Sequence, residues 1–334
     1  GAGSIGNHFS HACSRLHYNI FVTDLSKETL FRMKSKVYPK RYGKWNNNIK
    51  LIDYLKFPEI LKKNQFDLII IGTPPHTHLK IFKKLNKYKI KNILVEKPVC
   101  SFKENPSLFL RYNRKSKIYC GYNHSVSKSF EQFLKLVNKN KKEIDLVQVK
   151  WNESWRGILN AHFWMKNEFD SYLGDYKLGG GAIQEHSHGL HLIGLISNII
   201  NKKYSLKNFK SFTIYKKKNS KKYDYINSLY FQKNKTSYYL ETNLIDDPPT
   251  KKIICFLGKK RLIYCINFKN NYDAIIHDNI NKEKIRLFKK DRTSEFVNEL
   301  NHIFSIKNKK DYNKSNINIK TAINCLYNIK KILK

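Results

Sequence analysis

Two patterns of apolar and polar positions divide the chain near residue 123. Before that point, short apolar runs alternate with stretches whose apolar residues recur at helical spacing. The patterns predict strands at 18–24, 66–71, 92–96 and 118–122, helices at 7–17, 25–36, 53–63 and 76–88, and a loop at 37–50. The run at 66–71 is continuously apolar, as in a parallel strand buried on both faces. Alternating strands and helices predict a doubly wound parallel sheet, an α/β domain over residues 1–122.

Beyond residue 123, predicted strands follow one another without helices between them. The patterns predict a helix at 128–139, a strand at 146–152, a long irregular segment, a helix at 181–200, strands at 209–215, 225–232, 238–245 and 253–257, and helices at 294–306 and 317–333. Consecutive strands of this kind build an antiparallel or mixed sheet. Residues 123–334 are therefore predicted to form a second domain of the α+β class.

Composition narrows the classes of function. The net charge of +38 raises the question of nucleic-acid binding. Lys is spread along the whole chain, however, and Arg, the residue preferred for bidentate phosphate contacts, is scarce. We expect no nucleic-acid partner, although the charge would attract anionic substrates such as nucleotide sugars. The longest apolar runs, such as 68–71, are too short to cross a bilayer, so we expect no membrane partner.

Six cysteines are scattered along the chain. None forms a CxxC pair, which argues against a zinc site or a disulfide framework. Reduced thiols in a cytoplasmic protein are the simplest interpretation.

A glycine-rich motif, GxGxxG, occupies residues 1–6. In a dinucleotide-binding loop, Gly1 would permit the tight turn, Gly3 the approach of a pyrophosphate, and Gly6 the packing of the following helix. Such a loop normally follows a strand, and no apolar run stands before Gly1. We expect that strand to belong at the centre of the parallel sheet, so that without it the neighbouring strands are unpaired on both sides.

Asp24 lies 18 residues beyond Gly6, at the end of the second predicted strand. A carboxylate at this position accepts hydrogen bonds from the adenosine ribose and repels a 2′-phosphate, which favours NAD over NADP. The alternative is a surface Asp that caps the next helix.

Two further strand ends carry polar side chains, at 72–78 and at 96–98. Open α/β sheets bind ligands outside the carboxyl ends of their strands. Lys97 would project into that crevice, where an ammonium can hold a substrate hydroxyl and stabilise negative charge. The alternatives are an ordinary turn for 72–78 and a surface position for the lysine.

The segment 179–191 gathers titratable groups beside three glycines. On one helix, Glu185 and His188 would share a face, which suits a general base oriented by a carboxylate. His186 and His188 are two residues apart and would point to different sides. Only Gln184, His188 and His191, or Glu185 with His188, could converge on a metal, and we expect none.

These pieces together resemble the Gfo/Idh/MocA family, named for glucose–fructose oxidoreductase and inositol dehydrogenase. The resemblance rests on motifs spread over about residues 1–195: Gly1–Gly6, Asp24, Thr73-Pro74, Glu96-Lys97-Pro98, Gly121-Tyr122-Asn123, and Gly179-Gly180-Gly181 with the acid and histidine that follow. It implies an NAD(P)-binding Rossmann domain and a second domain whose open sheet often builds a dimer or tetramer. It also implies hydride transfer to or from a carbon of a sugar, cyclitol or nucleotide sugar.

The resemblance also suggests the roles of individual residues. Lys97 matches the family's active-site lysine, Glu185 stands where the family often has Asp, and His188 matches the catalytic histidine of members that read Ser-His. Other members place the histidine where this chain has Gly189, and His124 replaces a common Arg. The cofactor would contact Gly1, Gly3, Ser4, Ile5, Gly6, Asp24, Thr73, Pro74, His78, Glu96 and Lys97. The substrate would contact Asn123, Trp155, Arg156, Trp164 and His188, unless the tryptophans pack in the core.

The sequence thus predicts an NAD-dependent oxidoreductase on a polyhydroxylated substrate. His188 would remove the hydroxyl proton, Glu185 would orient His188, and Lys97 would hold the hydroxyl and the cofactor. The alternative is a non-catalytic ligand-binding or regulatory protein that keeps the fold.

Overall fold

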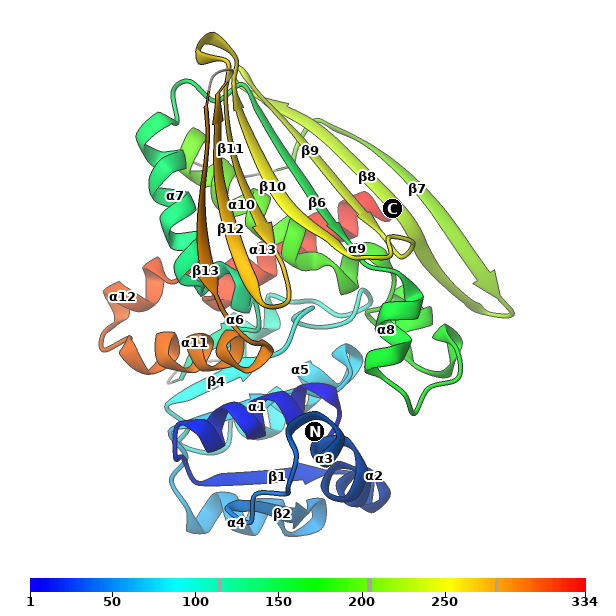
Figure 1. The fold of residues 1–334 in the computed structure, drawn as a ribbon. Helices are drawn as coiled ribbons and strands as arrows, with labels where there is room; N and C mark the ends of the chain where they lie inside the picture. Colours follow the sequence, from blue (N-terminus) through cyan, green and yellow to red (C-terminus); the bar gives the residue numbers. More distant parts are fainter. Residues whose placement is uncertain (113–115, 203–205, 280–281) are drawn as a thin grey trace.

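The first part of the chain forms parallel β-sheet flanked by helices (Figure 1). The computed structural model describes residues 1–112, 116–202, 206–279 and 282–334. The parallel strands are β1 (Ile20–Asp24), β2 (Ile49–Asp53), β3 (Leu68–Ile71), β4 (Asn92–Val95) and β5 (Lys117–Cys120). Helices α1 (Ser4–Arg15), α2 (Lys27–Arg32), α4 (Phe57–Lys63), α5 (Pro75–Leu85) and α6 (Leu108–Tyr112) alternate with them. The predicted Rossmann architecture is confirmed.

Residues 37–53 differ from the prediction. Instead of a loop, a π-helical turn (Met33–Val37) and α3 (Tyr38–Tyr42) continue from α2, because Met33 and Tyr38 pack on Ile20 and Val22. Strand β2 was not predicted at all. Its five residues lie between Asn-rich sequence and a helix, and only one of them is fully buried, so the apolar signal is weak.

The second part is an eight-stranded sheet in the order β13-β12-β11-β10-β6-β9-β8-β7. Its strands are β6 (Leu146–Asn152), β7 (Phe209–Lys218), β8 (Lys221–Lys233), β9 (Thr236–Asn243), β10 (Thr250–Leu257), β11 (Leu262–Phe268), β12 (Tyr272–Asn279) and β13 (Lys282–Lys289). All pairs are antiparallel except β6 with β9. The predicted mixed sheet is confirmed, and it extends beyond the individually predicted strands to β11, β12 and β13.

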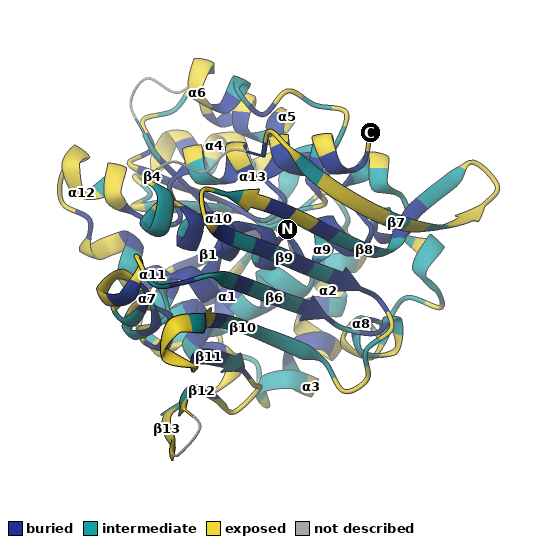
Figure 2. Ribbon diagram, turned by 90° about the horizontal axis from the view of Figure 1, so that it is seen from above, coloured by how far each residue is buried: buried dark blue, intermediate teal, exposed yellow. Residues whose placement is uncertain are grey.

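Helices cover one face of this sheet and leave the other open (Figure 2). The covering helices are α7 (Lys128–Asn140), α10 (Ser187–Asn201) and α13 (Ile319–Ile332). Strand register separates the faces: Ile253, Val149 and Leu240 are aligned and buried, whereas the alternate positions include Phe256 and Tyr230, which are partly exposed.

The end of the chain returns to the first domain. Helix α11 (Arg292–Ser305) packs on α1, and Arg15 pairs with Asp291 at 2.9 Å. The backbone N–H of Cys120, in β5, donates to the carbonyl of Ile317 at 2.9 Å. The Rossmann sheet is therefore covered in part by helices that are encoded after the second domain.

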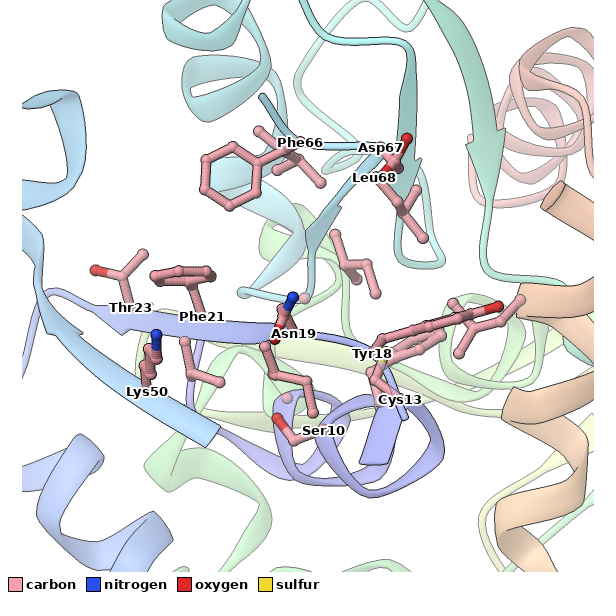
Figure 3. A pocket seen from close by; sticks show the side chains of 18 of the residues that line it. Ser10, Cys13, Tyr18, Asn19, Phe21, Thr23, Lys50, Phe66, Asp67 and Leu68 are labelled. Carbon is pink, nitrogen blue, oxygen red and sulfur yellow. The ribbon is translucent and has the colours of Figure 1, made fainter. Parts of the chain in front are cut away.

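The parallel sheet is interrupted between β1 and β3. Among the described residues, β1 pairs only with β2, and β3 only with β4. A slot of about 840 Å³ lies between the two halves (Figure 3). The expectation that these neighbours are unpaired is confirmed. Among all the residues that the structure describes, no helix is long and apolar enough to cross a membrane.

Candidate active site

The glycine-rich loop leads directly into α1. Gly3 is the N-cap, and no side chain caps the first turn, so its backbone N–H groups are free to bind an anion. A Cβ atom at Gly6 would overlap the carbonyl oxygen of Gly1, whereas one at Gly3 would meet no atom within 4 Å. Gly6 is thus required by close packing, and Gly3 leaves open space in front of the helix. This arrangement fits the pyrophosphate of a dinucleotide.

Asp24 ends β1 beside this loop. One carboxylate oxygen accepts the N–H of Ala2 at 2.8 Å, and the other accepts the N–H of Ser26 at 3.0 Å. The carboxylate is therefore held where a Rossmann fold places the adenosine ribose.

Residues 73–78 follow β3 and begin α5. Pro74 is the N-cap of α5, and the hydroxyls of Thr73 and Thr77 lie 2.6 Å apart. His78 is fully buried, with its ring nitrogens near the carbonyls of Thr73 and Val99, and burial lowers its pKa to about 4. The structure thus places Thr73 and Pro74 at the strand end, and His78 beneath them as a residue that positions the loop.

Lys97 and Glu185 form the polar centre of the site. The Nζ of Lys97 lies 3.2 Å from the Glu185 carboxylate and donates to the Glu185 carbonyl at 2.6 Å. The two side chains are only 13% and 22% exposed. Burial alone would raise the pKa of Glu185, but the Lys97, His186 and His162 charges outweigh it and hold that pKa below its usual value.

Glu96 lies under Lys97 and faces Gly121. Its carboxylate occupies the space that a Cβ at Gly121 would need, and it accepts the N–H of Lys97 at 3.2 Å. Burial raises the pKa of Glu96 to about 7. Glu96 therefore shapes the strand end from below.

A break in the helix separates His188 from Glu185. Helix α9 (Ala182–Glu185) ends at the acid, His186 is the link, and α10 begins at Ser187. No hydrogen bond between Glu185 and His188 occurs among the described residues, and the Nδ1 of His188 is buried without a partner. The two residues thus do not share one helix face as the sequence analysis expected, and Lys97 is the partner of Glu185.

Three aromatic rings surround His188, and the sequence analysis did not assign them to the site. Tyr122 and His124 meet it edge-on, with centroids at 5.5 and 4.9 Å, and Trp151 stacks on it at 5.7 Å. Burial lowers the pKa of His188 well below its usual value, so the imidazole is neutral near pH 7. Trp151 lies in β6, and no local sequence signal indicates that this strand contacts His188.

Gly189 faces away from the site. A Cβ atom there would lie 2.9 Å from the Cβ of Trp151 and 3.0 Å from Leu240. A histidine at this position would collide with the large sheet, whereas position 188 has room.

The predicted substrate residues are dispersed. Trp155 donates to the Tyr223 hydroxyl at 3.1 Å in an apolar cluster, and Arg156 is exposed beside Asp247. The Trp164 ring lies under Arg32 and Arg41, whose guanidinium carbons are 5.3 and 6.0 Å from it. Asn123 is buried and its side chain accepts the N–H of His124. Only Asn123 therefore adjoins the rings around His188.

The histidines of 186–191 lie in separate surroundings. His186 is influenced by Glu185 and Glu153, whereas the Nε2 of His191 lies 2.9 Å from the carbonyl of Asn316. Within the ranges that the structure describes, no three His, Cys, Asp or Glu side chains converge as metal ligands.

Residues 35–124 match the model of an oxidoreductase family with an NAD-binding Rossmann fold, GFO_IDH_MocA. Comparison with curated protein sequences gave no match.

Solved structures share the fold over nearly the whole chain. UDP-N-acetylglucosamine 3-dehydrogenase from Acidithiobacillus ferrooxidans has a TM-score of 0.68 at 14% identity, covering 99% of this chain and 94% of its own. An inositol dehydrogenase homologue from Azotobacter vinelandii, complexed with NAD+, has a TM-score of 0.63 at 12% identity, covering 84% and 79%. KijD10, a 3-ketoreductase from Actinomadura kijaniata in complex with NADP and TDP-benzene, has a TM-score of 0.65 at 8% identity, covering 92% and 86%.

Proposed function

We propose that this protein transfers a hydride between NAD and a carbon of a sugar substrate. A nucleotide sugar is the first candidate for that substrate, and a free sugar or a cyclitol is the alternative. The observation that carries the proposal is the pairing of Lys97 with Glu185 at the carboxyl ends of the parallel strands. Lys97 comes from the first domain and Glu185 from the second, and both charged side chains are largely buried. They meet at the place where open α/β sheets bind ligands.

The preference for NAD rests on Asp24. Its carboxylate is fixed beside the glycine-rich loop by two backbone N–H groups. A 2′-phosphate would meet this negative charge, whereas ribose hydroxyls can donate to it. The Ser4–Gly6 end of α1 would hold the pyrophosphate.

Each residue of the centre has a definite part in the proposed chemistry. A bound nicotinamide supplies the hydride acceptor or donor. The neutral imidazole of His188 accepts the proton of the substrate hydroxyl. The ammonium of Lys97 holds the hydroxyl oxygen and stabilises the negative charge that develops on it. Glu185 fixes that ammonium by the two contacts described above.

Nucleotide sugars are placed first among the substrates for two reasons. The net charge of +38 favours anionic ligands. Among the structural neighbours, one is a UDP-N-acetylglucosamine dehydrogenase and another was solved with TDP-benzene.

Cellular location and assembly belong to the same proposal. All six cysteines are free thiols, which a reducing, cytoplasmic compartment would maintain. The open face of the eight-stranded sheet presents apolar side chains that a second copy could cover, which supports a dimer or tetramer.

The test begins with calorimetric titration of NADH and NADPH. We expect tighter binding of NADH, weakened about tenfold by Asp24→Ala. Asp53→Ala is the matched control, because Asp53 is paired with Asp24 in register but ends the outer strand β2. Turnover is then measured across UDP- and TDP-linked sugars, free sugars and cyclitols. Binding of NADH without turnover of any of them would favour a non-catalytic ligand-binding protein.

A further inference from the structure

The large sheet carries a second ion pair near the site. The Nζ of Lys251 donates to a carboxylate oxygen of Glu153 at 2.7 Å. The two side chains are 24% and 25% exposed, so both are shielded and both keep an accessible part. The proposed chemistry uses Lys97, Glu185 and His188 and leaves this second pair without a role.

Strand register places Lys251 on the same face of the sheet as the rings around His188. Lys251, near the start of β10, is directly opposite Trp151 of β6. Opposite residues of an antiparallel pair point to the same face, and Trp151 stacks on His188. The next residues on this side of β10 are Ile253 and Cys255, both fully buried. Lys251 therefore ends an apolar row with a charged group beside the imidazole of His188.

Glu153 reaches the same face from the end of β6. It follows Trp151 by two residues, the spacing at which side chains along a strand return to one face. A Cβ atom at Gly157 would lie 3.2 Å from the Glu153 carboxylate, so the first turn of α8 (Trp155–Ala161) packs against it. Burial alone would raise the pKa of Glu153, but the charge and hydrogen bond of Lys251 outweigh it and hold that pKa below its usual value. The carboxylate is thus ionised and fixed in position.

Both ion pairs adjoin His186. Burial lowers the pKa of this histidine to about 4, and four neighbouring charges act on that pKa as well: Glu185, Glu153, Lys251 and Lys97. The Nε2 of His186 is buried and has no hydrogen-bond partner among the described residues. The histidine is neutral near pH 7, and the four charged side chains around it carry no net charge together.

Pairing leaves hydrogen-bonding capacity on both groups of the second pair. The Lys251 ammonium has N–H donors, and the Glu153 carboxylate has acceptor positions, beyond those that their contact uses. A sugar hydroxyl both donates and accepts, so adjacent hydroxyls of one ring can bind the two groups together. A carboxylate on the ring would meet an ammonium that is already neutralised, and Glu153 would repel it.

We propose that Lys251 and Glu153 bind adjacent hydroxyls of the sugar ring and thereby select an uncharged sugar over a uronic acid. This inference rests on the proposed function and narrows its substrate class. Lys97 holds the hydroxyl that reacts, and the second pair fixes hydroxyls further along the same ring.

The test measures kcat/KM with NAD, and Kd in the presence of NADH, for two matched pairs of probes. The pairs are glucose with glucuronate and UDP-glucose with UDP-glucuronate. We expect the wild type to favour the uncharged member of each pair at least about 100-fold. Glu153→Gln frees the Lys251 ammonium and should reduce this preference at least about tenfold. Lys251→Met should weaken binding of the uncharged sugars at least about tenfold without improving that of the uronates.

Two control variants alter the other face of the same sheet. Lys252→Met replaces the neighbouring lysine, whose side chain alternates to that face. Glu241→Gln removes an ion pair there, in which the Glu241 carboxylate lies 3.5 Å from the Nζ of Lys150. Both controls should keep the preference within about twofold of the wild type.

The outcomes separate this inference from the proposed function. Equal use of the two members, a preference for the uronate, or a preference unchanged in Glu153→Gln would overturn the role of the pair and leave the oxidoreductase intact. A preference in binding that Glu153→Gln reduces, without turnover of any probe, would support the pair and count against hydride transfer. An NADH complex that binds none of the four probes would overturn the inference, and turnover of a cyclitol would then still support the oxidoreductase.

Discussion

Lys97 contacts Glu185 twice, through its carboxylate at 3.2 Å and through its backbone carbonyl at 2.6 Å. The carbonyl contact ties the ammonium to the end of α9 whatever the charge of the carboxylate. The lysine follows β4 of the first domain and the acid lies in the second, so this pair also links the two domains across the site.

Replacing the lysine tests its place in the reaction. Lys97→Met is expected to lower kcat at least about 100-fold, because the hydroxyl oxygen loses its charged donor. The NADH Kd should rise by no more than about tenfold, since Lys97 is only one of the predicted cofactor contacts and the loop and Asp24 are untouched. Steady-state kinetics and calorimetry measure the two effects, and exposed Lys103→Met is the control. Loss of NADH binding with unchanged kcat would contradict the assignment.

The environment of His188 predicts a pH profile. Burial lowers its pKa well below 6.5, so the neutral base is present throughout the neutral range. We expect kcat for oxidation to stay level between about pH 6 and pH 8, and His188→Ala to lower it at least about 100-fold. His277→Ala, on β12, is the control. If instead the wild-type rate falls steeply below pH 7 and His188→Ala lacks this fall, then the pKa of His188 is raised rather than lowered.

Buried carboxyl groups predict how stability depends on pH. Burial raises the pKa of Glu96 to about 7, and burial together with Glu96 and Glu295 raises that of Glu299 well above 4.5. The folded protein holds these protons more tightly than the unfolded chain, so stability falls as pH rises from about 4.5 through 7.

A neutral substitution isolates this effect. Glu299→Gln should raise Tm at pH 8 by roughly 3 °C or more and change it little at pH 5, as scanning calorimetry can measure. The control is Glu131→Gln, at an exposed position, which loses only a surface ion pair with Lys135. It should leave Tm nearly unchanged at both pH values. An equal Tm change at both pH values would mean that the substitution acts through packing rather than through ionisation.

The open sheet face predicts the assembly state. Tyr230 and Phe256 lie on it, 42% and 36% exposed. We expect the wild type to be a dimer or tetramer by light scattering after size exclusion, and Tyr230→Lys with Phe256→Lys to give a monomer. Leu55→Lys, at an exposed position of the first domain, should leave the assembly intact. A monomeric wild type would remove this proposal.

Sequence reasoning succeeded where one physical requirement sets the residue pattern. The continuous apolar run Leu68–Ile71 predicts a strand, and the structure has one there, with Ile71 buried and the other three residues partly buried. Gly6 was predictable as well, because the carbonyl oxygen of Gly1 occupies the space that a Cβ at this position would need. It failed where distant packing decides. The break at His186 separates two residues that an unbroken helix would align, and the three rings around His188 come from residues 122–124 and from β6, both distant from residue 188 in the chain.

The predicted tryptophans illustrate the same limit. Trp155 has no local feature that distinguishes a core side chain from one that stacks on a sugar. Its hydrogen bond to Tyr223 and its apolar cluster decide in favour of the core.

The return of α11 and α13 to the first domain determines which parts of the molecule can move together. The Cys120–Ile317 hydrogen bond and the Arg15–Asp291 pair fasten the end of the chain to the Rossmann sheet. Helix α11, which packs on α1, would follow residues 1–122 in any opening of the site, whereas α13 also packs on α10 and so joins the two domains. A fragment that ends at residue 122 would lack α11 and α13, which cover part of its hydrophobic core. The unit that folds therefore includes residues from the end of the chain as well as residues 1–122.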